Sequence, residues 1–540
     1  MDSESLPDQI ARTMDSVTER KQMYDQGRKF MPINELERLI RANRKEVEKL
    51  CGIDHENPDS LNDIIRILAI LASRDLLKEK TYQTVRRIGI SDCHLPLVYD
   101  KSRSSFMSDI RVADAGQPRD IQEFESFLSG LANCIEFTEL QYRFCIPTFG
   151  NAEFTQLHSN SILPIYHLGK KTEVGSFGMV DQVQVHHAHL KLDRPVTKEN
   201  NPKLALKQLL SDSEAEFDRE REALSKIQKL CHDHLITLIA SFKRGREFFF
   251  LFPWAEGGNL RQLWNKNWSP TREQTEWALG QMLGLAEAIQ HLHLPTNNLD
   301  LTENGRHGDL RPENILAFHD KKAHGSVAVL KLRIADVGLA KFHQKITSER
   351  TAGTTTTGGS MEYAPPESLL EGEEVKRSRK YDMWSLGCIF LEFIVWVVEG
   401  PEGLAEFREE RAKKKTSNQT YSEYEPYYRG RWNNKGYEVH PKVRVRLSSI
   451  RKSPKSSKEL RALADIIEMG LLVVDEEKRF SAKQLMDMLK RAGLGTMENE
   501  EDNVRSELHK MEEPEKGKKV SRWRLRCLQI ISSPSSSRNY

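Results

Sequence analysis

The spacing of apolar residues divides the chain into a helical first part and a mixed later part. Before about residue 150, apolar side chains recur every three or four positions in stripes at 36–50, 61–71 and 124–131, as on one face of a helix. Ser60 and Asp63 form a capping-box pattern at the start of the second stripe. We therefore expect a helical N-terminal module over residues 1–150 that could serve as an interaction domain.

From about residue 162 the pattern changes to short runs typical of strands. Such runs occupy 180–185, 204–207 and 248–252, and a charged helix is predicted at 214–230, so this part reads as a small sheet with one helix. Helical periodicity then returns. The predicted elements there are a buried stripe at 279–292, a buried helix from 382 to about 398, and an irregular insert within 399–458.

Composition narrows the class of protein. The chain has 540 residues, of which 30% are charged, and its formal net charge of +2 gives no electrostatic reason to expect a nucleic acid as partner. The seven cysteines are scattered without paired spacing, which favours an intracellular location, in the cytoplasm or nucleus. The longest apolar run, 388–398, is too short to span a membrane and contains Glu392, so no transmembrane segment is predicted. The charged, then serine-rich tail at 496–540 is expected to be disordered.

Candidate chemistry is concentrated in the second part. The stretch 307–314, HGDLRPEN, is followed by Asp336, and two carboxylates with a carboxamide at this spacing suit a metal-nucleotide phosphotransfer site. Lys207 ends an apolar strand, where an ammonium group is rare unless an anion meets it. The turn GSFG at 175–178 can present backbone N–H groups to phosphates, although an ordinary glycine hairpin has the same pattern.

Together with GSMEYAPPE at 359–367 and DMWSLG at 382–387, these motifs resemble those of eukaryotic protein kinases of the serine/threonine type. The resemblance covers about 162–493. It implies an α+β, two-lobed catalytic domain with an N-lobe at about 162–252 and a mostly helical C-lobe at about 256–493. The N-terminal module is similar to one attached to kinases expanded in filamentous fungi.

The resemblance gives the catalytic residues their roles. Asp309 would position the acceptor hydroxyl and take its proton, and Arg311 would keep a positive charge near the transferred phosphate. Lys207 would meet the nucleotide phosphates and a glutamate of the following helix. Glu220 is the favoured glutamate, and Glu222 is the alternative.

The same resemblance implies that Mg²⁺ and ATP are bound. Asn314 and Asp336 would bind Mg²⁺, which prefers oxygen ligands. The Pro253 carbonyl and the Ala255 N–H would bind adenine, with Phe252 narrowing the pocket behind it. The remaining residues assigned to nucleotide binding are Gly175, Ser176, Phe177, Gly178, Val180, Ala205 and Lys207.

Some residues depart from the family pattern, and others support the fold alone. Glu173 replaces a glycine, Val337 replaces a phenylalanine, and Gly308 replaces the arginine that in many kinases grips an activating phosphate. The usual phosphorylation switch is therefore not expected. A buried salt bridge between Glu367 and Arg479 is expected, as is bracing of the catalytic loop by Asp382.

These observations lead to one hypothesis and two alternatives. The chain would be an ATP-dependent kinase that phosphorylates serine and threonine hydroxyls of protein substrates. The first alternative, favoured by the three departures, is a pseudokinase scaffold that binds partners, with or without nucleotide, and does not turn over. The second gives the main role to the N-terminal module as a recruitment domain with its own partner.

Overall fold

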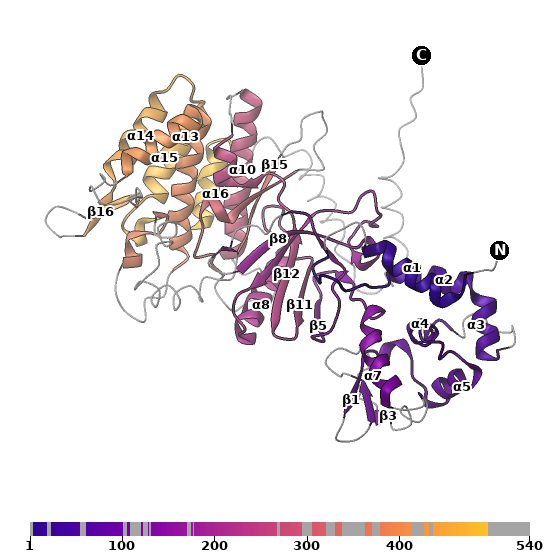
Figure 1. Cartoon of the computed structure of the whole chain (residues 1–540). Helices are drawn as coiled ribbons and strands as arrows, with labels where there is room; N and C mark the ends of the chain where they lie inside the picture. Colours follow the sequence, from indigo (N-terminus) through magenta and orange to yellow (C-terminus); the bar gives the residue numbers. More distant parts are fainter. Residues whose placement is uncertain are drawn as a thin grey trace, which may run out of the picture.

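The computed structural model describes the chain from residue 4 to residue 494 with gaps. The described residues are 4–18, 23–53, 61–100, 105–108, 120–121, 128, 131–169, 174–175, 178–266, 271–293, 305–319, 330–336, 362–369, 378–412, 426–430 and 436–494. The expected tail at 496–540 lies outside them. Three parts follow one another in space, namely an N-terminal module, a sheet, and a helical lobe (Figure 1).

The N-terminal module is largely helical, as predicted, and it also contains a small sheet. Its helices are α1 (Leu6–Thr18), α2 (Ile33–Ala42), α3 (Arg44–Cys51), α4 (Ile65–Ala72), α5 (Glu79–Ile88) and α7 (Leu131–Leu140). The antiparallel sheet consists of β1 (Leu97–Asp100), β2 (Ser105–Ser108) and β3 (Asp120–Ile121). Strands of two to four residues are too short for a period-two pattern to be visible in the sequence.

Two polar side chains define the ends of helices at positions that differ from those predicted by the apolar stripes. The stripe at 36–50 forms two helices instead of one, because the chain breaks at Asn43, whose Nδ2 donates to the Leu39 carbonyl at 3.0 Å. The second stripe becomes helical only at α4, beyond the predicted capping box. There the backbone amides of Arg66 and Ile67 donate to the distant Asp92 carboxylate at 2.8 and 3.1 Å. Of the third stripe, 122–127 lies outside the described residues.

The N-lobe is a sheet with one helix, which confirms the predicted arrangement. The strand order is β5-β11-β12-β10-β8-β6, with β7 paired to β8. Helix α8 (Glu214–Leu230) packs on one face through Phe217, whose ring lies 4.8 Å from Phe248 and 5.0 Å from Phe250. The strands are β5 (Phe154–Leu157), β6 (Ile165–His167), β7 (Val174–Gly175), β8 (Gly178–Val185), β10 (Leu204–Leu209), β11 (Ala240–Arg244) and β12 (Glu247–Pro253).

The sheet takes in chain that precedes residue 162, the expected start of the catalytic domain. Strand β5 pairs in parallel with β11 and forms one edge of the sheet, and β4 (Phe149–Gly150) pairs with β9 (Leu190–Lys191). At the opposite edge, Tyr24 donates its backbone N–H to the Ile165 carbonyl of β6 at 2.9 Å. On the face away from α8, Asp25 pairs with Arg244 at 2.6 Å. The N-terminal part is therefore joined to the N-lobe at its edge and across its outer face.

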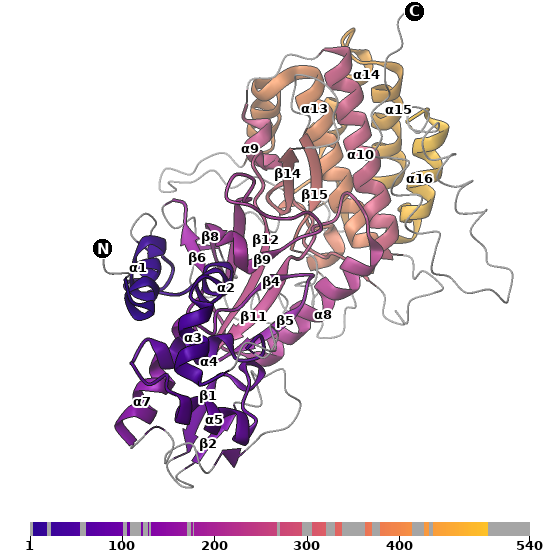
Figure 2. The ribbon, with the colours of Figure 1, turned by 90° about the vertical axis from the view of Figure 1, so that its right-hand side faces the viewer.

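The C-lobe packs its helices around one long buried helix, α13 (Figure 2). Helix α13 is long and apolar enough to cross a membrane, yet 94% of its most apolar 18-residue window is buried inside the protein. Its apolar surface is thus the core of the lobe. The elements of the lobe are β13 (Gly258–Asn259), α9 (Leu260–Trp264), α10 (Arg272–His293), β14 (Ile315–His319), β15 (Leu330–Ile334), α13 (Lys380–Arg411), β16 (Tyr428–Gly430), β17 (Tyr437–Val439), α14 (Pro441–Lys452), α15 (Lys458–Ile466) and α16 (Ala482–Arg491).

The region 399–458 is more regular than the predicted irregular insert. Helix α13 continues through a kink at Gly400, where φ is 79°, and ends only at Arg411. The described residues that follow form the β16–β17 hairpin and helix α14. Leu404 and Phe407 are buried and anchor the second half of α13 in the core of the lobe. A few apolar residues among many charged ones are therefore enough to stabilise this part of the helix.

Candidate active site

Lys207 is held between two carboxylates. Its Nζ lies 2.8 Å from Glu220 Oε1 and 3.0 Å from Asp336 Oδ1, and the residue is only 6% exposed. Burial acts to lower the pKa of the ammonium, but the carboxylates of Asp336 and Glu220 raise that pKa above its ordinary value. Lys207 is therefore charged at neutral pH despite its burial.

The helix α8 decides which glutamate meets Lys207. Phe217, Glu220 and Leu224 follow the helical spacing of its buried face. Glu222 lies on the exposed side and pairs with Lys226 at 2.9 Å. Of the two glutamates that the sequence left open, Glu220 is the one within reach of Lys207.

Asp336 closes this group from the C-lobe. It follows β15 with a φ of 55°, an uncommon backbone conformation for a residue other than glycine. Burial acts to raise the pKa of Asp336, but the Lys207 ammonium more than offsets this, so the pKa lies below its ordinary value. Its side chain is still 42% exposed, which leaves the carboxylate accessible to a ligand.

Asp309 and Asn314 are held together at the start of β14. Asn314 Nδ2 donates to the Asp309 carbonyl at 2.8 Å and to its Oδ2 at 3.1 Å. Burial raises the pKa of Asp309 above its ordinary value, although the neighbouring Arg311 and His307 act to lower it. The Arg311 guanidinium lies 3.6 Å from Asp309 Oδ2. The sequence motif thus places an acid, an amide and a cation around one point.

Asp382 holds the start of the predicted catalytic loop, residues 307–314, in place. This fully buried carboxylate accepts the backbone N–H of His307 at 2.8 Å and that of Gly308 at 2.7 Å, and it contacts His293 Nε2 at 2.8 Å. Gly308 has a φ of 75°, which glycine adopts without strain. The expected bracing is present, and backbone contacts fix the loop without an arginine at position 308.

The residues assigned to the nucleotide lie on or beside the N-lobe sheet. Val180 is paired directly opposite Lys207 on the neighbouring strand, and Ala205 is paired opposite Phe252, so all four share the sheet face on which α8 packs. A Cβ on Gly178 would lie 2.5 Å from the Gln208 carbonyl, so only glycine fits this approach. Gly178 is paired with Gly175 across the turn.

Several nucleotide assignments depend on backbone groups. Pro253 ends β12, and the chain then turns into the C-lobe. In the part of the chain that the structure describes, the Ala255 amide donates no hydrogen bond, which suits the expected contact to adenine. Ser176, Phe177, Glu173 and Val337 lie outside the described residues, so these sequence assignments remain predictions.

The donor set fits a magnesium ion that arrives with a nucleotide. Asn314 donates through Nδ2, which leaves its carbonyl oxygen available, and Asp336 offers a half-exposed carboxylate. Lys207, Glu220 and Asp336 together carry one positive and two negative charges. Magnesium bound with the nucleotide would add positive charge next to these two carboxylates.

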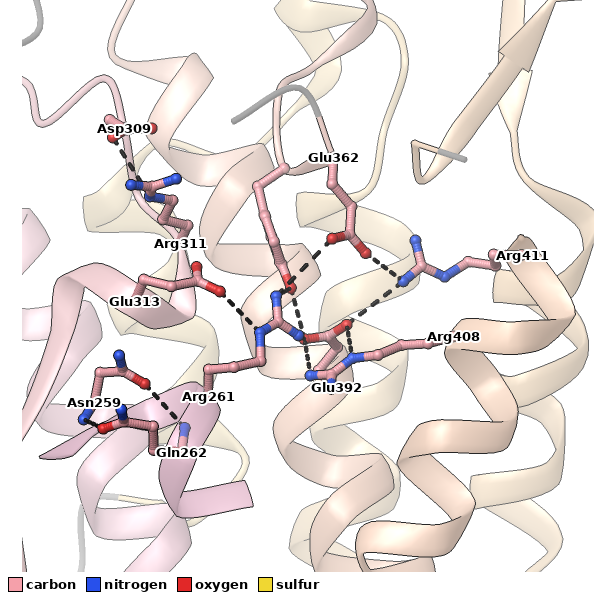
Figure 3. A network of polar contacts seen from close by, with 11 residues as sticks. Asn259, Arg261, Gln262, Asp309, Arg311, Glu313, Glu362, Glu392, Arg408 and Arg411 are labelled. Carbon is pink, nitrogen blue, oxygen red and sulfur yellow. Dashed lines mark hydrogen bonds and ion pairs between the residues drawn. The ribbon is translucent and has the colours of Figure 1, made fainter. Parts of the chain in front are cut away.

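A network of arginines and glutamates lies behind the catalytic loop (Figure 3). Fully buried Glu392 accepts from Arg408 at 3.1 Å and from the Tyr363 hydroxyl at 2.8 Å, and it lies 3.4 Å from Arg261 and from Arg411. The Arg408 and Arg261 guanidinium groups hold the pKa of Glu392 below its ordinary value, although burial acts to raise it. Glu392 interrupts the apolar run 388–398, and this buried charge was the one signal of the network in the sequence.

The network connects three segments that border the site. Arg261 on α9 pairs with Glu313 of the catalytic loop at 2.9 Å and donates to the Tyr363 hydroxyl at 2.6 Å. Glu362 pairs with Arg411 at 2.8 Å. These side chains fix residues 362–363 to α9 and α13, and Ser385 Oγ of α13 also donates to the Tyr363 carbonyl at 2.8 Å.

The second expected ion pair of the fold is also present. Arg479 is nearly fully buried and donates to the two carboxylate oxygens of Glu367 at 2.7 and 3.0 Å. It also donates to the Lys380 carbonyl at 2.9 Å. This bidentate pair ties the segment 362–369 to the start of α16 and to α13.

Comparisons with known proteins agree with this geometry. A protein kinase domain model matches residues 191–489, a range that contains Lys207, Asp309, Asn314 and Asp336. The serine/threonine-protein kinase PKH3 of Eremothecium gossypii is 29% identical over 178 residues, 32% of this chain and 21% of that protein. The probable serine/threonine-protein kinase fhkD of Dictyostelium discoideum is 31% identical over 185 residues, 33% of this chain and 22% of that protein. The similarity thus spans about a fifth of the length of each of these two relatives.

Proposed function

Because the chain belongs to the protein kinase family, we propose that it transfers the γ-phosphate of Mg²⁺-ATP to serine and threonine hydroxyls of protein substrates. The observation that carries this proposal is the grouping of Lys207 with Glu220 and Asp336, and of Asp309 with Asn314. Relatives named as serine/threonine kinases support this acceptor type.

The side chains divide the work as follows. Asp309 accepts the proton of the acceptor hydroxyl while the oxygen of that hydroxyl bonds to the γ-phosphorus. The bond between the γ-phosphorus and the β–γ bridging oxygen breaks, and ADP is released. Arg311 supplies positive charge near the transferred group, and Lys207 binds the phosphates. Asp336 and Asn314 would hold Mg²⁺, which would neutralise phosphate charge. Positioning and charge neutralisation, more than covalent chemistry, account for the rate.

Asp309 is suited to this role by its surroundings. Burial raises its pKa above the ordinary value, which makes the carboxylate a stronger base than one in water. The neighbouring Arg311 and His307 act in the opposite direction and lower this pKa. The hydrogen bond from Asn314 fixes which oxygen faces the acceptor.

A transfer assay tests the proposal. The purified full chain with Mg²⁺ and γ-labelled ATP is expected to label a peptide library on serine and threonine. Asp309→Asn is expected to lower kcat by about 10²- to 10⁴-fold. Asp465→Asn, which removes a half-exposed carboxylate of α15 away from the site, is the matched control and should keep full activity. No transfer by the wild type, or no loss in Asp309→Asn, would contradict the proposal.

A pseudokinase scaffold is the second candidate, and Gly308 is the observation that favours it. Without an arginine at this position, the loop has no side chain with which to grip an activating phosphate. A thermal shift with Mg²⁺-ATP in a chain that shows no turnover would favour the scaffold. Measurable turnover excludes it.

We also propose an intracellular location and a separate partner for the N-terminal module. The six cysteines of the described residues are all free, which supports a reducing compartment. The module has its own apolar core, which includes Leu36, Leu68 and Phe137. Detection of the full chain outside the cell would contradict the location, and a pull-down with the full chain tests for a partner.

A further inference from the structure

Strand β5 is the outermost strand of the N-lobe sheet and belongs to the linker that follows the N-terminal module. It pairs in parallel with β11, with Phe154 opposite Ser241 (Figure 1). The Ser241 amide donates to the Glu153 carbonyl at 3.1 Å, and the Ala152 amide donates to the Ile239 carbonyl at 2.9 Å. The protein kinase match begins at residue 191, so β5, like β6, β7 and β8, precedes the matched range.

The register directs Phe154 toward α8. Phe154 is opposite Ser241, which in turn is opposite Phe250, so the three side chains share the face on which α8 packs. The Phe154 ring lies 5.8 Å from the ring of Phe217. The guanidinium carbon of Arg221 lies 4.9 Å from the centroid of the Phe154 ring. Both contacting residues belong to α8.

These two contacts flank the glutamate that meets Lys207. Phe217 precedes Glu220 by one helical turn, and Arg221 follows it directly. The second half of α8 is anchored in the apolar core by Leu224. The first half depends on Phe217, which packs on the sheet and also contacts the Phe154 ring.

We propose that Phe154 is a positioning residue for phosphoryl transfer, which holds α8 so that Glu220 stays within reach of Lys207. Phe154 acts through α8 and touches neither nucleotide nor acceptor. The linker of the N-terminal module thereby supports the site in cis. The activity part of this proposal rests on the proposed kinase function, whereas the contact with α8 does not.

A mutant cycle on the full chain tests the activity part. Phe154→Ala is expected to lower kcat/KM for ATP by about three- to tenfold. Phe154→Tyr keeps the aromatic ring and is expected to keep the wild-type kcat/KM. In a Glu220→Gln background, Phe154→Ala should add no further loss, because its effect passes through Glu220. Val445→Ala, an exposed apolar residue of α14, is the matched control. Losses that multiply in the double variant would overturn the proposal.

Hydrogen exchange tests the contact without any need for turnover. In Phe154→Ala the backbone amides of residues 217–224 are expected to exchange faster than in the wild type, and those of α14 to stay unchanged. Arg221→Gln, which leaves β5 intact, should give the same change at smaller size. Faster exchange confined to β5 would overturn the proposal. If α8 loosens in a chain that shows no transfer, the kinase function fails and the positioning role stands.

Discussion

The charged cluster around Lys207 and the charged cluster around Glu392 differ in charge balance and in exposure. The cluster at the site joins one ammonium group, Lys207, to two carboxylates, and the Asp336 side chain is 42% exposed. The cluster behind the loop pairs three guanidinium groups with three carboxylates, and Glu392 at its centre is fully buried. The members of the second cluster are Arg261, Arg408, Arg411, Glu313, Glu362 and Glu392.

This difference indicates that the balanced cluster stabilises the fold, whereas the cluster around Lys207 binds a ligand. A balanced buried cluster has its charges satisfied by its own members, so it fixes the segments that supply them. The site cluster has an excess negative charge and an accessible carboxylate, so it is completed only by a cation or a ligand that brings one. We therefore expect substitutions in the balanced cluster to affect stability first and substitutions in the site cluster to affect turnover first.

The largest effect on stability is predicted for Glu392→Gln. This change leaves three arginines around a neutral amide, and breaking a buried ion pair by removing one partner costs about 3–5 kcal/mol. Glu220→Gln should cost less than half as much, because Lys207 keeps Asp336 as its partner. Urea denaturation of both variants measures the two losses. Equal losses would contradict the distinction between the clusters.

A double variant sharpens the claim of charge balance. Glu362→Gln and Arg411→Gln each leave one buried charge without its partner at 2.8 Å, whereas the double variant removes both charges. The double variant should therefore lose less stability than the sum of the two single losses, by about 1–3 kcal/mol. The same denaturation experiment on all four proteins gives this coupling. Additive losses would show that the pair is not coupled.

Much of the fold, and the site residues that lie close in sequence, could be predicted because local spacing encodes them. The periodicity over 214–230 coincides with α8, and the run at 204–207 with the start of β10. Contacts between distant segments carry no such local signal. Neither the cap supplied by Asp92 nor the strand β5 follows from periodicity, because each depends on a partner that only the folded chain brings near.

The network around Glu392 shows the same limit at the site. A glutamate in an apolar run indicates that a cation must be near. The sequence does not say which arginine it is, because Arg261 is 131 positions away while Arg408 is only 16 away. The choice between Glu220 and Glu222 likewise needed the orientation of α8, although helical spacing already favoured Glu220.

The pH dependence of turnover probes the site cluster more finely. The pKa of Asp309 is raised by burial and partly restored by Arg311, so the acid limb of kcat/KM should lie above the ordinary aspartate value of about 4. Arg311→Gln removes the nearby positive charge and should move this limb to higher pH. Rate measurements between pH 5 and 9 show the shift, which is separate from any loss of kcat. An unmoved limb would mean that another group titrates.

The smallest predicted effect is a change in Tm that has opposite signs for substitutions of Asp309 and Asp336. The pKa of Asp309 is raised in the folded chain, so its ionised form destabilises the fold, and any stabilisation is lost as pH rises through that pKa. The pKa of Asp336 is lowered, so its ionised form stabilises the fold, and this contribution is lost as pH falls through that pKa. At pH 7, Asp309→Asn should therefore raise Tm, and Asp336→Asn should lower it, each by about 1–3 °C because both groups are partly screened. Thermal unfolding without nucleotide measures both shifts. The Asp309 shift should shrink as pH falls toward the ordinary aspartate value of about 4, and the Asp336 shift should shrink only below that value. Tm shifts of the same sign would show that the two ionised carboxylates do not have opposite effects on the stability of the fold.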